Sequence, residues 1–367
     1  MNQDELVKLI LIDLRVVFRS DIHDPNQEEN QQYSDRLLKF LQEKLRCKKF
    51  VPKAFSLNSE LIETIEQKDL PPQKNGDHMT FIYICDVKIS YNYDSIILSD
   101  YGTHHIFVFG LESKKFKTRI KTLNSPSYLC IEENYVMPSS DDSIEDANHN
   151  IQRGKDALLV VCESRNMLLK CDFKLLLQQP DDIVSSDDKS TQESTHDSIL
   201  WSCDFDSCPQ GMAIKDNHLF VCLASAMIKI MDCCTAKTIS EIPLTFDPYG
   251  ITFTNDGKTL LCSTFSHENV GSVYCIFEES ENDWKIGKSF GTYTLRRPYS
   301  LLSDKVSNHI IVSDLPSSRI VIFTPDGQMV KSFQTASMIK PFGICLNERT
   351  GELIVCDHSS EMVFIFK

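Results

Sequence analysis

The sequence predicts an all-β protein built from repeated sheets, and two observations support this. A motif of Pro, any residue, Gly or Ser and an apolar residue occurs four times, with its prolines at 209, 248, 298 and 341 spaced 39, 50 and 43 residues apart. Each copy is followed by a continuously apolar run, a turn and an alternating run, as expected of a doubly buried strand and one nearer an edge. Repeats of this length are typical of propeller blades. We therefore expect a six-bladed β-propeller of four-stranded antiparallel blades, with a short helical N-terminal extension.

Six units can be counted, each with one such pair of strand-like runs. The runs are Ser95–Phe109, Ala157–Phe173, His218–Asp232, Thr259–Phe277, His309–Phe323 and Glu352–Phe366. A looser copy of the motif, Ser125–Ile131, opens the second unit, and the first unit begins near Phe81 without the proline. Two polar insertions, Pro138–Asp156 and Gln179–Ser198, lengthen the second unit, and we expect both to be solvated loops.

The last unit stops at Lys367, directly after its third strand, so its outer edge would stay unpaired. The segment Ala54–Glu66 resembles Ile322–Gln334, where a third strand turns into a fourth. We expect Leu61–Glu66 to supply the missing strand and close the ring. The expected boundaries are 1–49 for the N-terminal extension and 50–367 for the propeller.

The repeat resembles the NHL repeat in its P-x-G-[IL] opening, a strand that ends in Asp, and an alternating I-x-[VI]-F strand. Blade five matches best, through Asp314 and Arg319–Phe323, and the resemblance covers roughly residues 54–367. Blades one and six also match, with Asp100 and Asp357 at the strand-ending position. Blades three and four depart from the repeat, with Leu223 and Thr264 near that position. Blade four is equally similar to the related YVTN and SMP-30-like propellers. WD40 repeats are disfavoured, because neither Trp201 nor Trp284 is followed by Asp.

Residues 1–49 lie outside the repeat. We expect helices over Asp4–Phe18 and Asp35–Cys47, joined by a polar linker at Asp24–Ser34. Ser34 is a suitable cap for the second helix, whose leucines fall on one face. Three alternatives remain open: the helices pack on the propeller, they dock a partner, or the first stretch is a strand.

Charge and cysteine usage limit the function classes. A net charge of −14 argues against nucleic acid as the partner. The longest apolar stretch, Leu6–Phe18, is too short and too charged to span a membrane and lacks a signal-peptide layout, so we expect a soluble, cytoplasmic protein. The 14 cysteines form no C-x-x-C pair and mostly lie in apolar runs, which predicts buried free thiols in a reducing compartment.

No motif for nucleotide binding, α/β-hydrolase chemistry or zinc fingers occurs, so we expect no cofactor. The resemblance does imply an alternative, since some related propellers are lyases or lactonases with a divalent ion at the central channel. The histidines that follow the strand-ending positions are weak candidate ligands: His104, His105, His267 and His358. It also implies a second alternative, RNA binding, for which the candidate residues are Arg296, Arg297, Tyr299 and the basic run Lys114–Lys121. We interpret that run as a charged outer strand that prevents sheet-to-sheet pairing.

The leading hypothesis is a non-enzymatic protein–protein interaction scaffold, monomeric, whose propeller loops bind another protein or a peptide. The alternative is the metal-dependent propeller enzyme. The acidic balance favours a basic or neutral partner. The expected contact loops are Asp100–His105, Glu163–Asn166, Phe265–Asn269, Asp314–Arg319 and Asp357–Glu361. Within them the candidate residues are Asp100, Tyr101, His104, His105, Glu163, Arg165, His267, Asp314, Arg319, Asp357 and His358.

Overall fold

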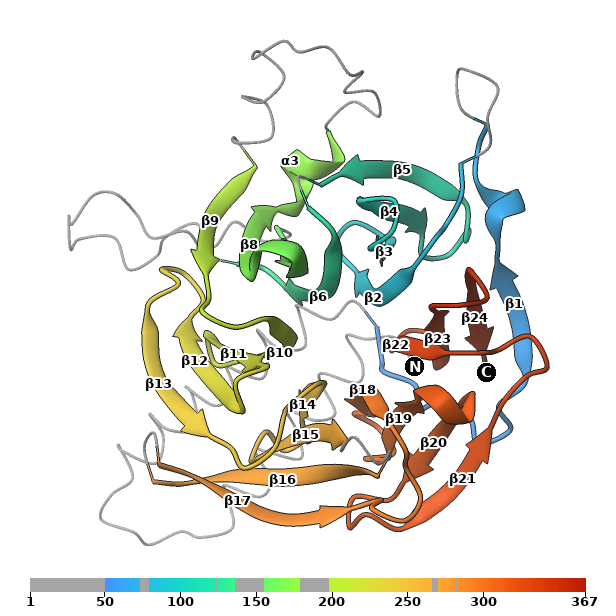
Figure 1. The fold of residues 1–367 in the computed structure, drawn as a ribbon. Helices are drawn as coiled ribbons and strands as arrows, with labels where there is room; N and C mark the ends of the chain where they lie inside the picture. Colours follow the sequence, from blue (N-terminus) through green and yellow to red (C-terminus); the bar gives the residue numbers. More distant parts are fainter. Residues whose placement is uncertain are drawn as a thin grey trace, which may run out of the picture. The chain divides into compact units, whose positions relative to one another are not determined.

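Six four-stranded antiparallel sheets make up the fold in the computed structural model (Figure 1). The structure describes residues 50–72, 79–122, 124–135, 155–178, 198–265, 270–280 and 283–367. The sheets follow one another around a ring, each with its first strand at the centre and its last at the rim. This confirms the six-bladed propeller. The helices and linker expected over residues 1–49 lie outside the described residues.

The blades are numbered in sequence order, and their strands run as follows. Blades one and two contain β2 (Ile84–Ser90), β3 (Ser95–Asp100), β4 (His105–Gly110) and β5 (Phe116–Lys121), then β6 (Pro126–Glu132), β7 (Ala157–Cys162), β8 (Met167–Asp172) and β9 (Ile199–Asp204). Blades three and four contain β10 (Pro209–Lys215), β11 (His218–Leu223), β12 (Met227–Asp232) and β13 (Thr238–Pro243), then β14 (Ile251–Phe253), β15 (Thr259–Phe265), β16 (Gly271–Ser280) and β17 (Asp283–Phe290). Blades five and six contain β18 (Pro298–Ser303), β19 (Ile310–Asp314), β20 (Arg319–Phe323) and β21 (Met329–Phe333), then β22 (Pro341–Asn347), β23 (Glu352–Asp357), β24 (Met362–Phe366) and β1 (Leu61–Ile65).

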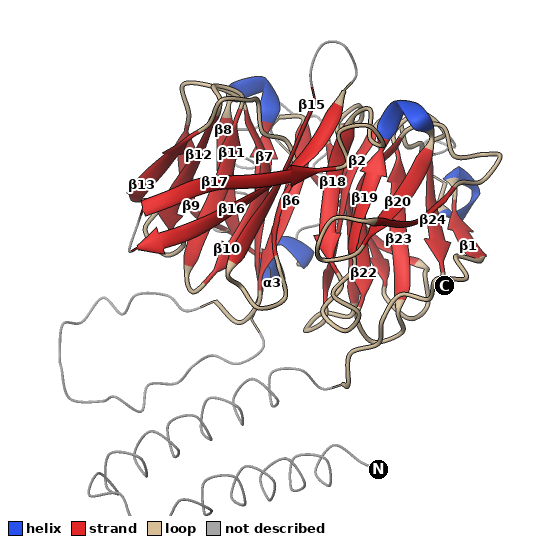
Figure 2. Cartoon of the chain, turned by 90° about the horizontal axis from the view of Figure 1, so that it is seen from below, coloured by secondary structure: helices blue, strands red, loops and turns tan. Residues whose placement is uncertain are grey.

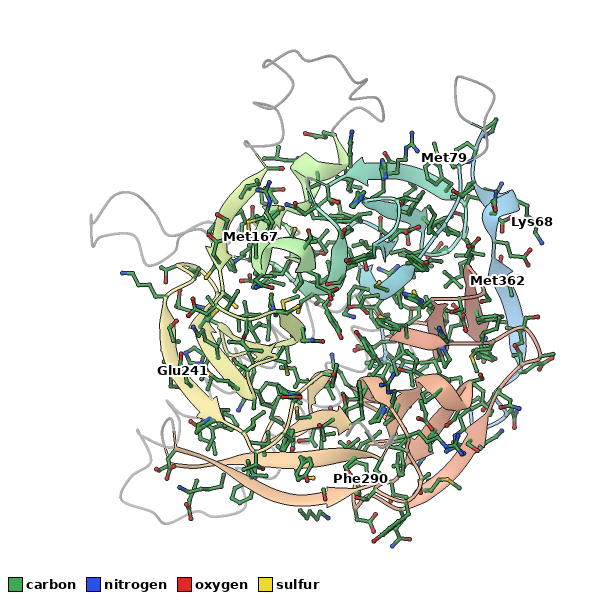
Figure 3. All side chains as sticks on the ribbon, in the orientation of Figure 1. Lys68, Met79, Met167, Glu241, Phe290 and Met362 are labelled. Carbon is green, nitrogen blue, oxygen red and sulfur yellow. The ribbon has the colours of Figure 1, made fainter. Side chains whose placement is uncertain are left out.

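The second strand of each blade is buried on both faces, which explains its continuously apolar sequence. In β3, Ile96 and Leu98 pack toward blade six, whereas Ile97 between them packs toward blade two. The described residues form six such apolar clusters, one between each pair of neighbouring blades. Side chains therefore fill the space between the sheets all around the ring (Figure 3).

The ring is closed by the segment expected from the sequence. β1 pairs antiparallel with β24, with Leu61 opposite Phe366 and Ile65 opposite Val363. Glu60 and Lys367 extend this ladder, because each donates its backbone N–H to the carbonyl of the other at 2.8 Å. The N-terminal part of the described chain thus provides the outer strand of the C-terminal blade.

The repeated motif places a residue without a side chain where two inner strands approach each other. A Cβ atom on Gly211 would lie 2.3 Å from the carbonyl oxygen of Tyr249, and one on Gly250 would lie 2.5 Å from that of Tyr299. Each glycine of the motif therefore lets its blade contact the backbone of the next blade.

The ends of the two insertions differ from the solvated loops expected there. Asp156 is fully buried and accepts hydrogen bonds from Ser90 Oγ at 2.5 Å and Asn92 Nδ2 at 2.7 Å, and Ser198 is also buried. Asp156 thus has buried or half-buried polar partners in blade one, and the Ser198 carbonyl accepts from the Asp172 amide of blade two at 2.8 Å. The second insertion leaves the blade through helix α3 (Phe173–Leu177), whose start is capped by Asp172. The remainder of both insertions lies outside the described residues.

A second, small unit contains residues 50–53 and 348–351 of the described chain. Within it, the Lys53 amide donates to the Glu348 carbonyl at 2.8 Å, and the Arg349 guanidinium lies 5.3 Å from the centre of the Phe50 ring.

Every cysteine that the structure describes is a free thiol, and most are buried. Burial raises the pKa of Cys130 to about 12 and that of Cys162 to about 11. Thiols of this kind stay protonated and act as small apolar side chains. Free buried thiols are thus confirmed for the described residues.

Candidate functional site

One end of the blades carries nearly all the residues expected to be functional, and we call it the loop face. Because the strands are antiparallel, every connection from a second to a third strand lies at this end, as does every connection into an inner strand. Two of the second-to-third connections are short 3₁₀ helices, Glu163–Arg165 and Leu315–Ser317. They lie at the same end of the ring, opposite α3 (Figure 2). Of the expected loop Phe265–Asn269, only Phe265 is described.

Three of the candidate acidic residues are buried beneath the loop face and hold its loops in place through hydrogen bonds. Asp100, Asp314 and Asp357 end the second strands of blades one, five and six and are 0% exposed. Asp357 accepts hydrogen bonds from four backbone amides, two in the segment entering β22 at 2.7 Å and two in its own loop at 3.0 and 2.8 Å. Such a carboxylate anchors two loops to each other and is not available to touch a partner.

The other two carboxylates have the same role. Asp100 accepts from the amides of Ile82 and Tyr83 at 2.8 and 3.0 Å, and Asp314 accepts from those of Arg296 and Arg297 at 2.9 and 3.0 Å. The corresponding positions of blades two to four carry other residues. The Asp of the repeat therefore positions the loops of three adjacent blades.

Replacing Asp357 by Ala is expected to lower the free energy of unfolding by about 2–4 kcal/mol, since each buried amide left without an acceptor costs roughly 1–3 kcal/mol. Asp357→Asn is expected to restore part of this, because one oxygen can still accept. Urea unfolding followed by circular dichroism measures both. Glu361→Gln in the same loop is the control and should change stability by less than about 0.5 kcal/mol. An equally small change in Asp357→Ala would refute the anchoring role.

The candidate histidines do not converge on one point. His104 Nδ1 lies 3.1 Å from Ser125 Oγ, and His105 Nδ1 lies 2.6 Å from the Thr103 carbonyl, so each is engaged near its own loop. His358 stacks on an aromatic ring instead, and His267 lies outside the described residues. Within the described ranges, no group of three His, Cys, Asp or Glu side chains could hold a metal ion.

The other expected contact residues differ in whether their side chains are free to contact a partner. Arg319 is occupied, because its guanidinium pairs with Asp314 at 3.2 Å and donates to the Thr294 carbonyl at 2.5 Å. Tyr101 is half-buried and its amide donates to the Tyr83 carbonyl. Glu163 and Arg165 are exposed on the 3₁₀ helix of blade two.

The most extended feature of the loop face is a series of rings in contact, some stacked and some tilted, which we call the aromatic arc. It crosses blades four, five, six and one and consists of Phe265, Tyr249, Tyr299, Phe342, His358 and Tyr83. In its first half, ring centres are 4.2 Å apart for Phe265 and Tyr249, 5.6 Å for Tyr249 and Tyr299, and 3.6 Å for Tyr299 and Phe342. Each ring touches the next, so the arc is a continuous apolar surface.

The second half of the arc reaches blade one. The Phe342 and His358 ring centres are 5.3 Å apart, and His358 stacks on Tyr83 at 4.6 Å with an angle of 17° between the planes. Burial lowers the pKa of His358, and the charge of Lys340 lowers it further, so this imidazole is neutral at pH 7. Tyr83 is the most accessible ring of the arc, with 45% of its surface exposed.

One ring of the arc, Tyr299, also meets a tyrosine of the opposite blade, Tyr128 of blade two. The rings of Tyr128 and Tyr299 are parallel, with centres 5.7 Å apart, and the Tyr128 hydroxyl donates to Gln210 Oε1 at 2.9 Å. Burial raises the pKa of both phenols well above the usual value. Both hydroxyls therefore stay protonated and uncharged.

Sequence reasoning missed the arc, although one signal for it was present. Tyr249, Tyr299 and Phe342 each occupy the variable position of the Pro-x-Gly/Ser motif, at or just before the start of an inner strand. Aromatic residues at three consecutive copies of that position would have suggested a shared surface. The other three rings come from loops that only the folded ring brings together.

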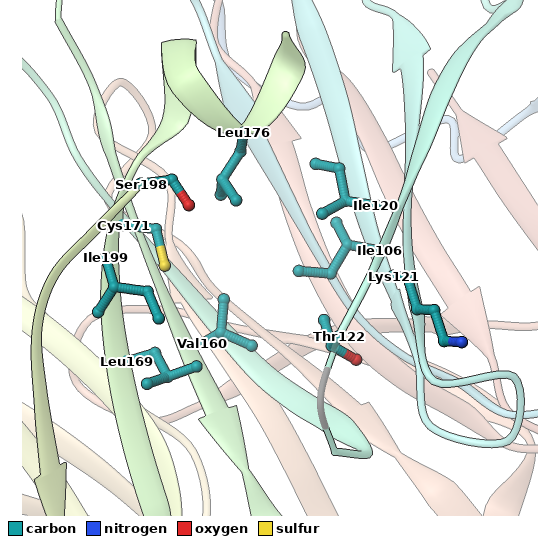
Figure 4. A pocket seen from close by; sticks show the side chains of 10 residues that line it. All are labelled: Ile106, Ile120, Lys121, Thr122, Val160, Leu169, Cys171, Leu176, Ser198 and Ile199. Carbon is teal, nitrogen blue, oxygen red and sulfur yellow. The ribbon is translucent and has the colours of Figure 1, made fainter. Parts of the chain in front are cut away.

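One pocket lies away from the arc, between blades one and two (Figure 4). It is a partly open pocket with a cavity volume of about 50 Å³, and Ile106, Ile120, Val160, Leu169 and Leu176 form most of its apolar wall. Cys171 and Ser198 complete one side. Its lining contains one charged residue, Lys121, whose ammonium group points away from the apolar side chains (Figure 4). The pocket offers space for an apolar group but no catalytic arrangement.

Comparisons with known proteins leave the family open. No protein-family profile and no curated protein matches the chain. Among solved structures, the β-propeller domain of Cps50 (Swd1) from Myceliophteria thermophila is 10% identical, with 84% of this chain and 99% of that chain covered and a TM-score of 0.49. A functionally unknown protein from Desulfotomaculum acetoxidans DSM 771 is 13% identical, covers 72% of this chain and 73% of its own, and has a TM-score of 0.47. The evidence for the propeller fold is the six four-stranded sheets themselves.

Within the described part of the chain, no helix is both long and apolar enough to cross a bilayer.

Proposed function

We propose that this propeller is a non-enzymatic interaction module that binds a protein or peptide on its loop face, with the aromatic arc as the central contact surface. We also propose that its repeats are NHL-like, that residues 1–49 form a separate extension, and that it works as a monomer in the cytoplasm. Buried free thiols support the reducing location. The continuity of the arc across four blades is the observation that carries the proposed function.

Aromatic rings are suited to this role because they provide a large contact area and have few rotatable bonds. The rings of the arc are already held by their neighbours, so binding would order few side chains. Loops on a rigid frame commonly carry recognition, and Asp100, Asp314 and Asp357 fix the loops around the arc. The alternative of a metal-dependent enzyme has no group of three ligands among the described residues to support it.

Replacing Tyr83 by Ala is expected to weaken peptide binding by about tenfold or more, as is typical for truncation of an aromatic contact residue. Peptides are first selected against the full chain from a random display library, and their affinities are then measured by fluorescence anisotropy. Tyr83 is chosen because it is the arc residue that the fold buries least.

The matched control is Tyr293→Ala, because Tyr293 is fully exposed and lies in the connection into blade five, outside the arc. Its affinities should stay within about twofold of the wild type. Selection of no peptide, or of peptides that bind Tyr83→Ala and the wild type equally, would reject the arc as a binding surface. Melting temperatures of both variants show whether the fold is intact.

A further inference from the structure

A single guanidinium, that of Arg297, lies on the blade-four end of the aromatic arc. It is 4.7 Å from the centre of the Phe265 ring, and Phe265 stacks on Tyr249 at 4.2 Å with an angle of 18° between the planes. Arg297 belongs to the connection that enters blade five, whereas Phe265 ends the second strand of blade four. The side chain of Arg297 therefore reaches from one blade to the next and ends on the arc.

The backbone of Arg297 is fixed on both sides before any partner binds. Its amide donates to Asp314 Oδ1 at 3.0 Å, and its carbonyl accepts from the Leu315 amide at 3.2 Å. Pro298 follows directly, and a residue before proline is restricted to extended conformations. Binding at this side chain would therefore order little of the backbone.

The charge of Arg297 has no counter-ion in the part of the chain that the structure describes. Its Nε is buried there without an acceptor, and no ion pair joins the guanidinium to a described carboxylate, that of the exposed Asp247 included. Arg319 in the same blade differs, because its Nε and a terminal nitrogen each bond to Asp314 at 3.2 Å. Arg297 is half-buried, so part of its side chain remains accessible to a partner.

An arginine held on an aromatic face is suited to bind a carboxylate. The ring attracts the guanidinium by its face, and the N–H donors stay available for an oxygen acceptor. Guanidinium and carboxylate groups match in planar geometry, and their hydrogen bonds are about twice as strong as neutral ones. Because the Phe265 ring shields one side of the guanidinium, water competes less for these donors. The exposed Arg296, directly before Arg297, adds a second positive charge.

We propose that this end of the arc binds one carboxylate of the partner, from an Asp or Glu side chain, with the Arg297 guanidinium on the Phe265 ring as its counter-ion. This inference rests on the proposed function and specifies the chemistry of its partner. The net charge of −14 opposes a polyanion such as RNA, whereas a single charge in contact with Arg297 is screened from charges more than about 8 Å away. The acidic residue of the partner should therefore stand among neutral residues.

The test uses four fluorescein-labelled nonapeptides, Gly-Ser-Pro-Tyr-X-Tyr-Pro-Ser-Gly, in which X is Glu, Asp, Gln or Lys. Their affinities for the full chain are measured by fluorescence anisotropy. We expect the Glu or Asp peptide to bind at least about tenfold more tightly than the Gln peptide, which has the shape of Glu without its charge. Arg297→Gln is expected to reduce this preference to less than about threefold. Arg297→Lys keeps the charge but not the planar fork and should retain part of the preference.

Lys340→Gln is the matched control. Lys340 precedes Pro341 in blade six as Arg297 precedes Pro298 in blade five, and it is exposed, but its ammonium lies on no ring of the described residues. This variant changes the net charge by the same amount as Arg297→Gln and should keep the preference within about twofold of the wild type. Melting temperatures show whether each variant is folded.

The inference is overturned if the wild type binds the Glu and Gln peptides equally, if the preference survives in Arg297→Gln, if Lys340→Gln removes it equally, or if none of the four peptides binds. If the Gln and Glu peptides bind equally and both lose affinity in Tyr83→Ala, the arc is a binding surface that does not select an acidic partner. Binding of a labelled oligouridine that Arg297→Gln removes, without a preference for the Glu peptide, would assign the site to nucleic acid instead. The display selection decides separately whether the arc binds peptides at all.

Discussion

Deleting residues 54–66 is expected to cost at least about 5 kcal/mol of unfolding free energy, which approaches the whole stability of an ordinary domain. These residues include β1, whose loss would turn β24 into an unpaired edge and expose the apolar cluster between blades six and one. They also include Phe55, which is buried between blades five and six and donates its amide to Asp304 at 3.0 Å. A ring without its closing strand loses contacts at both neighbouring interfaces.

Two point variants on the same strand separate closure from nonspecific damage. Ile65 is 1% exposed and Ile62 is 44% exposed. Ile65→Ala is expected to lower the unfolding free energy by about 2–5 kcal/mol, whereas Ile62→Ala should lower it by less than about 1 kcal/mol. Thermal and urea unfolding give both values. Unchanged melting of the deletion variant, or equal effects of the two alanines, would show that β1 is dispensable.

Lys170→Met is expected to destabilise the protein by about 3–5 kcal/mol, because it leaves a buried carboxylate without its counter-ion. Lys170 is 2% exposed, and its ammonium lies 2.5 Å from Glu132 and donates to the Cys233 carbonyl of the next blade at 2.8 Å. The side chain therefore joins blades two and three through a buried charge. Trp201 Nε1 donates to the same carbonyl at 2.9 Å and remains in the variant.

The pH dependence of this loss has a definite sign. Burial raises the pKa of Glu132 and Lys170 opposes that effect, so removing Lys170 raises the pKa further. In the variant, Glu132 therefore binds a proton more tightly in the folded state than in the unfolded state. Lowering the pH from about 8 to about 5 then favours the folded state, so the loss of stability caused by Lys170→Met should become smaller. Urea unfolding at each pH, relative to the wild type, measures it.

Two further variants serve as controls. Adding Glu132→Gln to Lys170→Met removes the orphaned charge and should recover part of the lost stability. Lys229→Met breaks the partly exposed ion pair with Glu241, at 3.4 Å, and should cost less than about 1 kcal/mol. A Lys170→Met loss no larger than that of Lys229→Met would mean that the buried pair does not join the blades.

The blade architecture was predictable because its signals are local. Ile96–Leu98 are continuously apolar since a second strand is buried on both faces. The prolines at 209, 298 and 341 of the motif, and Pro126 of its looser copy, begin inner strands. Closure was predictable for a related reason, because Leu61–Ile65 has the pattern of an outer strand with no partner nearby in sequence.

The functional surface was predictable only in part. The sequence predicted that Asp100, Asp314 and Asp357 contact a partner. In the structure, their carboxylates instead accept hydrogen bonds from backbone amides 17 or 18 residues earlier in the chain. His358 and Phe265 belonged to expected contact loops, but the contact of the six rings with one another was not expected.

The sequence by itself determined the repeat, the number of blades and the strand that closes the ring, because strand periodicity and turn chemistry act over a few residues. Only the tertiary structure decided which side chains meet at the centre of the loop face. Tyr83 and His358 stack although 275 positions separate them in the sequence, and Tyr128 and Tyr299 meet from opposite blades. Such contacts depend on the curvature and closure of the whole ring, which no local pattern encodes.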